Sequence, residues 1–320
     1  MKKISIIIVN GFPRKDLPDY PAEKCRLDVI QYPWIDICLR QVQRHSNSES
    51  YEVYIYDDAR LESHRQIMAN YPNIVDIYPQ SLEEFDDGST KNLPTALNFT
   101  ISRLRDNIEY FILLDTDAFP IRDNWLDIFI NLLNDGAPVV CVCRDEKAPR
   151  LKPFAHVCCL CMRKADFLKM GVWFYEEMAI AGAEFNYIAT LDWLERGAKI
   201  VGLQRSNVKK YHDLMGGVYG NLVYHQAAVN RFARFRTASN EVDMEHEFLR
   251  VKLRDAIFQD LDALIEEFIP CPYNAIAQLP IPPIDIGDTH PFLLQEKHIY
   301  EIKIKLQKSQ QRLQTIQAKL

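Results

Sequence analysis

The sequence predicts an α/β protein: a mostly parallel sheet flanked by helices, followed by a helical C-terminal extension. Three observations lead to this fold class. Strand-like and helix-like patterns alternate over the first two hundred residues. The strand-like runs are almost wholly apolar, as in strands buried on both faces. The chain has 320 residues, 48% of them hydrophobic, which is enough to bury a sizeable core. Repeated strand–helix–strand units favour right-handed crossovers, with helices on both faces of the sheet.

Each element is predicted from its own pattern. Apolar runs indicate four strands, at 4–10, 51–56, 74–78 and 110–114. Apolar residues at helical spacing indicate the helices between them, at 34–42, 61–70 and 93–106. Later in the chain, strands are expected at 139–143, 157–161 and 200–203, and a helix at 187–196 that Gly197 ends.

The composition divides the chain into four parts. Residues 1–236 form the predicted α/β domain and 237–269 a helical extension. A proline-rich linker, 270–291, leads to 292–320, where apolar residues recur at heptad spacing, as in an amphipathic or coiled-coil-like helix. This tail carries six Lys and Arg against two Glu. We expect it to pack on its own domain or on a second copy of the chain, with binding to a membrane surface as the alternative.

Charge and hydropathy exclude several classes of protein. The net charge of −6, from 38 basic and 44 acidic residues, argues against a nucleic-acid binder, which needs a basic surface. The apolar run 4–9 is too short for a signal peptide, and no segment approaches the ~20 apolar residues that span a bilayer. We therefore expect a cytoplasmic protein, with peripheral contact at the inner membrane face through the tail as an alternative.

Five of the eight cysteines lie in the apolar strands 139–143 and 157–161. Their Cys-x-Cys spacing differs from the Cys-x-x-Cys that is usual for zinc, and alternation in an apolar strand favours cysteine as a small core residue. Core packing is the preferred interpretation, and a zinc site is the alternative. Free buried thiols are typical of a reducing compartment.

The main chemical signal is the pair Asp115 and Asp117, directly after the apolar run 110–114. Two carboxylates at the end of a buried strand can reach one hard cation, and Mg²⁺ or Mn²⁺ prefers oxygen ligands. Parallel sheets bind ligands beyond the carboxyl ends of their strands. A second acidic pair, Asp57 and Asp58, ends another predicted strand, so we expect both pairs at one edge of the sheet.

On these residues the chain resembles the nucleotide-sugar glycosyltransferases of the GT-A fold, and it is most similar to the large family-two group. The resemblance covers about residues 1–230 and rests on five segments: 4–10, 53–58, 95–98, 113–117 and 184–201. It implies a GT-A (Rossmann-like) sheet, a UDP- or GDP-sugar donor, and Mn²⁺ or Mg²⁺ as cofactor.

The resemblance also implies roles for individual residues. The nucleotide sugar would be held by Val9, Asn10, Asp57 or Asp58, Asn98 and Asp115. The metal would be held by Asp115 and Asp117, with His225 completing its shell, as a C-terminal His does in several relatives. Glu184 would act as the catalytic base, with Asp192 and Asp145 as substitutes.

The chain departs from the family in three places. It has Ala96-Leu97-Asn98 where the family often has Ala-Arg-Asn, it lacks a clean acidic pair before the late helix, and its connection after the first strand is long. The segment 209–226 carries further candidates: His212 for the metal, and Lys209 and Lys210 for phosphate. The aromatic residues 173–175 would either stack on an acceptor sugar or belong to the core.

Together these observations predict a metal-dependent, inverting glycosyltransferase that transfers a sugar to a hydroxyl of a glycan or lipid-linked acceptor. The first alternative is a non-catalytic scaffold protein of the same fold. A haloacid-dehalogenase-type phosphohydrolase is disfavoured, because the sequence after Asp117 and its place in the chain do not suit that class. A nucleotidyltransferase is disfavoured because the first strand is followed by one glycine, Gly11, where a phosphate loop needs several.

Overall fold

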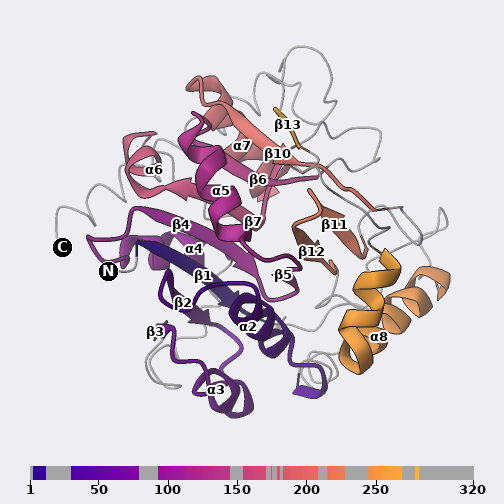
Figure 1. Cartoon of the computed structure of the whole chain (residues 1–320). Coiled ribbons are helices and arrows are strands. Elements are labelled where there is room, and N and C mark those ends of the chain that lie inside the picture. Colours follow the sequence, from indigo (N-terminus) through magenta and orange to yellow (C-terminus); the bar gives the residue numbers. More distant parts are fainter. Residues whose placement is uncertain are drawn as a thin grey trace.

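The computed structural model describes ten segments of the chain (Figure 1): 3–11, 30–78, 93–144, 154–170, 174, 179–180, 183–207, 215–227, 244–268 and 278–280. Within them lies one sheet of eight strands, in the order β13-β10-β6-β7-β4-β1-β2-β3. These strands are β1 (Ile4–Asn10), β2 (Tyr51–Asp57), β3 (Ile74–Tyr78), β4 (Tyr110–Asp115), β6 (Val139–Arg144), β7 (Phe154–Arg163), β10 (Ile200–Leu203) and β13 (Gln278–Pro280).

Helices cover both faces of this sheet. They are α2 (Trp34–Arg44), α3 (Glu62–Met68), α4 (Leu93–Ser102), α5 (Trp125–Asn134), α6 (Lys164–Met170) and α7 (Phe185–Glu195). The strand β1 shows why its sequence is apolar throughout. Ile6 and Ile8 point into a core shared with α2 and α5, whereas Ile7 points into a second core shared with α4, α6 and α7. The prediction of a mostly parallel sheet flanked by helices is confirmed.

The sheet is mixed rather than wholly parallel. Four pairings are parallel, those of β1 with β2 and β4, of β2 with β3 and of β6 with β10. The strand β7 is inserted antiparallel between β4 and β6, and β13 is antiparallel to β10. Because β7 runs the other way, its first residues, not its last, lie at the edge where β4 and β6 end.

A small sheet extends this edge. The strands β5 (Ala118–Pro120), β11 (Gly217–Tyr219) and β12 (Val223–His225) form it in the order β11-β12-β5. The helix α8 (Met244–Phe268) lies beside it (Figure 1), and apolar residues of α8 share a third core with Phe119 and Tyr224. Helical geometry breaks inside α8 at Asp260. The two-stranded hairpin β8 (Ala179–Ile180) and β9 (Ala183–Glu184) precedes α7.

The cysteines of the described strands pack in the core. Cys141, Cys143, Cys158, Cys159 and Cys161 are all free and buried. Burial raises the pKa of the thiols of Cys141, Cys158, Cys159 and Cys161 well above the usual range, so they remain protonated. The preferred interpretation of these cysteines as core residues is therefore confirmed.

Several predictions fall outside the described residues, namely those on Asp145, Trp173, Tyr175, Lys209, Lys210, His212, the tail 292–320 and all of the linker 270–291 except 278–280. The helix α8 lies within the range expected for the helical extension. No helix in the described part of the chain combines the length and the apolar character needed to cross a bilayer.

Candidate metal and nucleotide site

The register of the parallel strands brings the two acidic pairs to one edge of the sheet. In β1, Val9 pairs with Tyr56 of β2 on one side and with Asp115 of β4 on the other. The next residue, Asn10, pairs with Asp57. Because all three strands run in the same direction, their carboxyl ends meet here, as expected for a ligand site in such a sheet.

Three candidate metal ligands converge at this edge. Asp115 ends β4 and Asp117 lies in the turn before β5, and both are partly buried. Each of Asp115, Asp117 and His225 offers one ligand atom, and these atoms all lie within 4.8 Å of one another. Among the residues that the structure describes, this is the one group of three or more His, Cys, Asp or Glu with such spacing.

His225 reaches this position through strand pairing. It pairs with Ala118 of β5, the residue after Asp117, and the backbone N–H of Gln226 donates to the carbonyl of Asp117 at 2.9 Å. His225 Nε2 then lies 3.7 Å from Asp117 Oδ1. The chain leaves the strand at Ala227, a buried residue with φ of 60°, in the left-handed region that favours glycine.

A buried thiol, that of Cys38, lies close enough to Asp115 and Asp117 to respond to their charge. The thiol of Cys38 on α2 donates to the carbonyl of Asp115 at 3.8 Å. Burial, followed by the nearby charges of Asp117 and Asp115, raises the pKa of Cys38 well above its usual range. A cation bound by the two carboxylates would offset their effect on this thiol.

Sequence reasoning missed two buried polar residues beside these ligands. The ring of His156 lies 5.6 Å from that of His225, centroid to centroid. Arg144, the last residue of β6, places its Nη1 atom 2.9 Å from His156 Nε2. A charged residue at the end of an apolar strand was the available signal for Arg144, because it repeats the pattern of Asp57 and Asp115.

The end of β2, which the sequence predicts to hold the nucleoside, is built differently. Asp57 is fully buried, and its Oδ2 accepts a hydrogen bond from Arg65 Nε at 2.6 Å. Its Oδ1 accepts from Asn10 Nδ2 at 2.8 Å and from the backbone N–H of Arg60 at 3.2 Å. Asp58, by contrast, is only partly buried and lies beside Gly11. Of the two carboxylates predicted to hold the nucleoside, Asp58 is the more exposed.

Asn98 makes a paired contact within the protein. Its Nδ2 donates to the carbonyl of Phe174 at 2.6 Å, and its Oδ1 accepts from the N–H of the same residue at 2.9 Å. This pairing fixes Phe174 against α4, and Phe174 belongs to the core rather than to an exposed stacking platform. A role for Asn98 in nucleotide binding remains a prediction.

Two of the three candidate bases, Glu184 and Asp192, lie at or near α7, which is anchored to the first half of β7. Asn186 Oδ1 accepts from Val157 N–H at 3.2 Å, and Thr190 Oγ1 accepts from Ala155 N–H at 3.0 Å. Glu184 ends β9 immediately before this helix, two residues before Asn186. Asp192 Oδ1 accepts a hydrogen bond from Nε of Arg196, four residues further along the chain, at 3.3 Å. Both assignments remain predictions.

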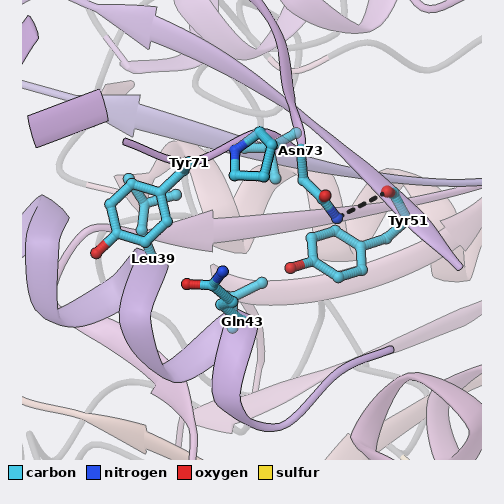
Figure 2. A pocket seen from close by; sticks show the side chains of 8 residues that line it. Leu39, Gln43, Tyr51, Tyr71 and Asn73 are labelled. Carbon is cyan, nitrogen blue, oxygen red and sulfur yellow. Dashed lines mark hydrogen bonds between the residues drawn. The ribbon is translucent and has the colours of Figure 1, made fainter. Parts of the chain in front are cut away.

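A small crevice lies near the opposite edge of the sheet, where the parallel strands begin (Figure 2). Leu39 and Gln43 of α2, Tyr51 at the start of β2, and Tyr71 and Asn73 are among its lining residues. Its volume of about 10 Å³ is near the smallest that holds one water molecule. Because it opens at the amino end of β2, it is separate from the site at the carboxyl ends.

No protein-family model and no curated protein matches the sequence. Among solved structures, the chain is similar to a mannosyltransferase, PcManGT from Pyrobaculum calidifontis, in complex with GDP-Man and Mn²⁺, with 12% identity and a TM-score of 0.44 over 65% of this chain and 58% of that one. It is also similar to TarS 1–349 of S. aureus in complex with UDP-GlcNAc, with 13% identity and a TM-score of 0.41 over 60% and 53% of the two chains.

A third similar structure is 4-diphosphocytidyl-2C-methyl-D-erythritol synthase from Anaerococcus prevotii, with 14% identity and a TM-score of 0.43 over 79% of this chain and 96% of that one. The match spans little more than half of the mannosyltransferase and of TarS 1–349.

Proposed function

We propose that this chain is a metal-dependent glycosyltransferase that moves a sugar from a nucleotide-sugar donor to a hydroxyl group of a glycan or lipid-linked acceptor. One observation carries the proposal: Asp115, Asp117 and His225 converge within 4.8 Å at the carboxyl edge of the sheet, beside the strand ends that carry Asn10 and Asp58. This is where an α/β sheet binds a nucleotide, and it provides ligands for a cation next to it.

The three ligands fit a divalent cation. Two carboxylates and one imidazole suit Mn²⁺, and they fit Mg²⁺ less well, because Mg²⁺ prefers oxygen ligands throughout. Three protein ligands leave coordination positions open for phosphate oxygens. When bound, the ion would neutralise the negative charge that develops on the leaving diphosphate.

The remaining roles belong to side chains of the protein. Asp58 and the backbone near Val9 would orient the nucleoside, while the Asn10–Asp57–Arg65 contacts hold the strand ends rigid. Glu184 would take the proton from the acceptor hydroxyl as that oxygen attacks the anomeric carbon, which gives inversion. Asp115 and Asp117 would serve as carboxylate ligands of the ion and would take no part in this proton transfer.

The first experiment measures Mn²⁺ binding by electron paramagnetic resonance, and nucleotide-sugar hydrolysis with and without chelator. We expect Mn²⁺ to bind, and UDP or GDP with Mn²⁺ to raise the melting temperature, because ligands of the native state stabilise it by mass action. A chain that binds neither Mn²⁺ nor any nucleoside diphosphate would contradict the proposal. Metal-dependent nucleotide binding without any hydrolysis or transfer would favour the non-catalytic scaffold instead.

The base is tested separately with Glu184→Gln. This variant should bind donor and Mn²⁺ normally but transfer sugar roughly 10²–10⁴-fold more slowly, the usual contribution of a general base. The control is Asp192→Asn, which changes the carboxylate bonded to Arg196. Normal transfer by Glu184→Gln together with slow transfer by Asp192→Asn would move the base to Asp192.

A further inference from the structure

The proposed function makes no use of a buried cation at the same edge of the sheet. Arg144 ends β6 with only 3% of its surface exposed, and His156 near the start of β7 is 6% exposed. Asp117, His225, His156 and Arg144 form a continuous row, with successive contacts of 3.7 Å, 5.6 Å between ring centroids, and 2.9 Å. Arg144 is therefore connected to the candidate metal ligands through His156.

The hydrogen bonds of His156 indicate what this pair would bind. The backbone N–H of Cys158 donates to Nδ1 of His156 at 3.1 Å. The other ring nitrogen, Nε2, faces Nη1 of Arg144, which is also a donor, at 2.9 Å. A neutral imidazole has one proton and one lone pair, so it accepts from only one of these two donors. When Nδ1 accepts from Cys158, the Nε2–H and the guanidinium of Arg144 are two adjacent donors, and an anionic oxygen that accepts from both would stabilise this arrangement through charge-assisted bonds.

The strand order places this pair on the acceptor side of the metal. Along the edge, the order β2-β1-β4-β7-β6 puts the nucleoside residues first, Asp115 next and Arg144 last (Figure 1). Neighbouring strands are ~4.8 Å apart, so β6 lies about 10 Å beyond β4, on the side away from the nucleoside. A donor whose nucleoside lies over β1 and β2 extends toward β4, and an anion at Arg144 belongs to the molecule that approaches from the opposite side.

We propose that Arg144 and His156 form a subsite for an anionic group, a phosphate or a carboxylate, on the acceptor. This inference rests on the proposed function, because it takes the metal cluster as the place of the donor diphosphate. Arg144 binds the anionic oxygen, and His156 is a positioning residue that adds one hydrogen bond. The acceptor is then an anionic glycan or a phosphate-bearing lipid rather than a neutral sugar.

The test uses the full chain saturated with Mn²⁺ and with UDP or GDP, so that the metal positions are already filled. Binding of inorganic phosphate to this complex is measured by calorimetry. We expect Arg144→Gln to weaken phosphate binding roughly tenfold to hundredfold, and His156→Ala to weaken it less. Arg144→Lys should retain part of the phosphate binding, because lysine keeps the positive charge but lacks the planar guanidinium group, which can donate two parallel hydrogen bonds.

Two further measurements separate this role from a structural one. Arg144→Gln should leave Mn²⁺ affinity unchanged or raise it, because it removes a positive charge near the acidic pair; damage to the fold would lower it. The matched control is Arg163→Gln, which removes a partly buried arginine from the opposite end of β7, where it pairs with Asp166 at 2.9 Å. This control should bind phosphate normally.

The possible outcomes separate a failure of the acceptor subsite from a failure of the proposed function. If Mn²⁺ and nucleoside diphosphate do not bind the unmodified chain, the proposed function fails. If they bind but inorganic phosphate does not, or binds Arg144→Gln equally well, the acceptor subsite is wrong while the function stands. If Arg144→Gln instead weakens nucleoside diphosphate binding tenfold, the anion at Arg144 is the donor diphosphate, and the acceptor assignment is overturned.

Discussion

The two acidic strand ends look alike in sequence but differ in the structure. Asp57, at the end of β2, is fully buried and bonded to Arg65, which lies eight residues later on the next helix. Asp115 and Asp117, at the end of β4, are partly exposed and converge with His225 from a distant strand. Carboxylates whose partners are all internal support the fold, whereas carboxylates that converge with a third ligand at an edge are available for a cation.

The largest expected effect is on activity, and it comes from a change at the end of β4. Asp117→Ala should reduce metal-dependent donor turnover by about a thousandfold or more, because it would remove a ligand of the ion that we propose stabilises the leaving group. Its unfolding free energy should change little. The assay is nucleotide-sugar turnover across a Mn²⁺ titration. Full activity of this variant in the presence of chelator would reject metal assistance.

The next largest effect is on stability, and it comes from a change at the end of β2. Asp57→Ala should destabilise the protein by about 3–5 kcal/mol, because it leaves the guanidinium of Arg65 without its carboxylate partner. Urea unfolding measures this difference. The double variant Asp57→Ala/Arg65→Met should recover part of the loss. If Asp57→Ala were as stable as the unmodified chain but unable to bind nucleotide, the contrast between the two ends would be wrong.

A smaller effect separates Asp57 from its neighbour. Asp58→Asn should weaken nucleoside diphosphate binding roughly tenfold, through loss of one charge-assisted hydrogen bond, with little change in stability. Calorimetric titration with UDP and with GDP measures the change. Equal affinity in the variant and the unmodified chain would remove Asp58 from the site and return the nucleoside role to Val9 and Asn10.

The smallest effect concerns the pH dependence of stability through two tyrosines of β2, Tyr51 and Tyr54. Burial raises the pKa of Tyr51 to about 12 and that of Tyr54 to about 12, above the usual value for tyrosine. Because the folded pKa lies above the unfolded one, this stabilisation is complete below about pH 10 and is lost as the pH rises toward 12. Tyr51→Phe should lose less stability over this window, as measured by urea unfolding; an identical slope would contradict it.

Much of the fold follows from local patterns. The predicted strand at 4–10 matches β1, and those at 74–78 and 200–203 match β3 and β10. These runs are apolar because both faces of the sheet are covered, so the pattern is strong. The helix predicted at 93–106 ends earlier, at Ser102, and 61–70 is reduced to Glu62–Met68. Helix ends depend on local capping, which periodicity does not report.

Other features depend on contacts between distant residues. An apolar run has the same pattern in both directions, so the antiparallel direction of β7 could not be predicted from it. This direction brings His156 to the edge of the sheet where the site lies. The pairing of β12 with β5 rests on three-residue strands that are too short to show a period. The motif at Asp115 and Asp117 could be predicted, and a role for His225 was implied by family resemblance alone. Arg144 and the bond between Asp57 and Arg65 needed the structure.

The pairing of β5 with β12 also has a consequence for biosynthesis. The chain between the two strands includes β6, β7, α7 and β10, all of which are made after Asp117 and before His225. A ribosome-bound chain that ends anywhere in this stretch has both carboxylates but lacks the imidazole. The proposed three-ligand site can therefore be complete only after β12 has left the exit tunnel, and shorter chains would offer a cation two carboxylates without the imidazole.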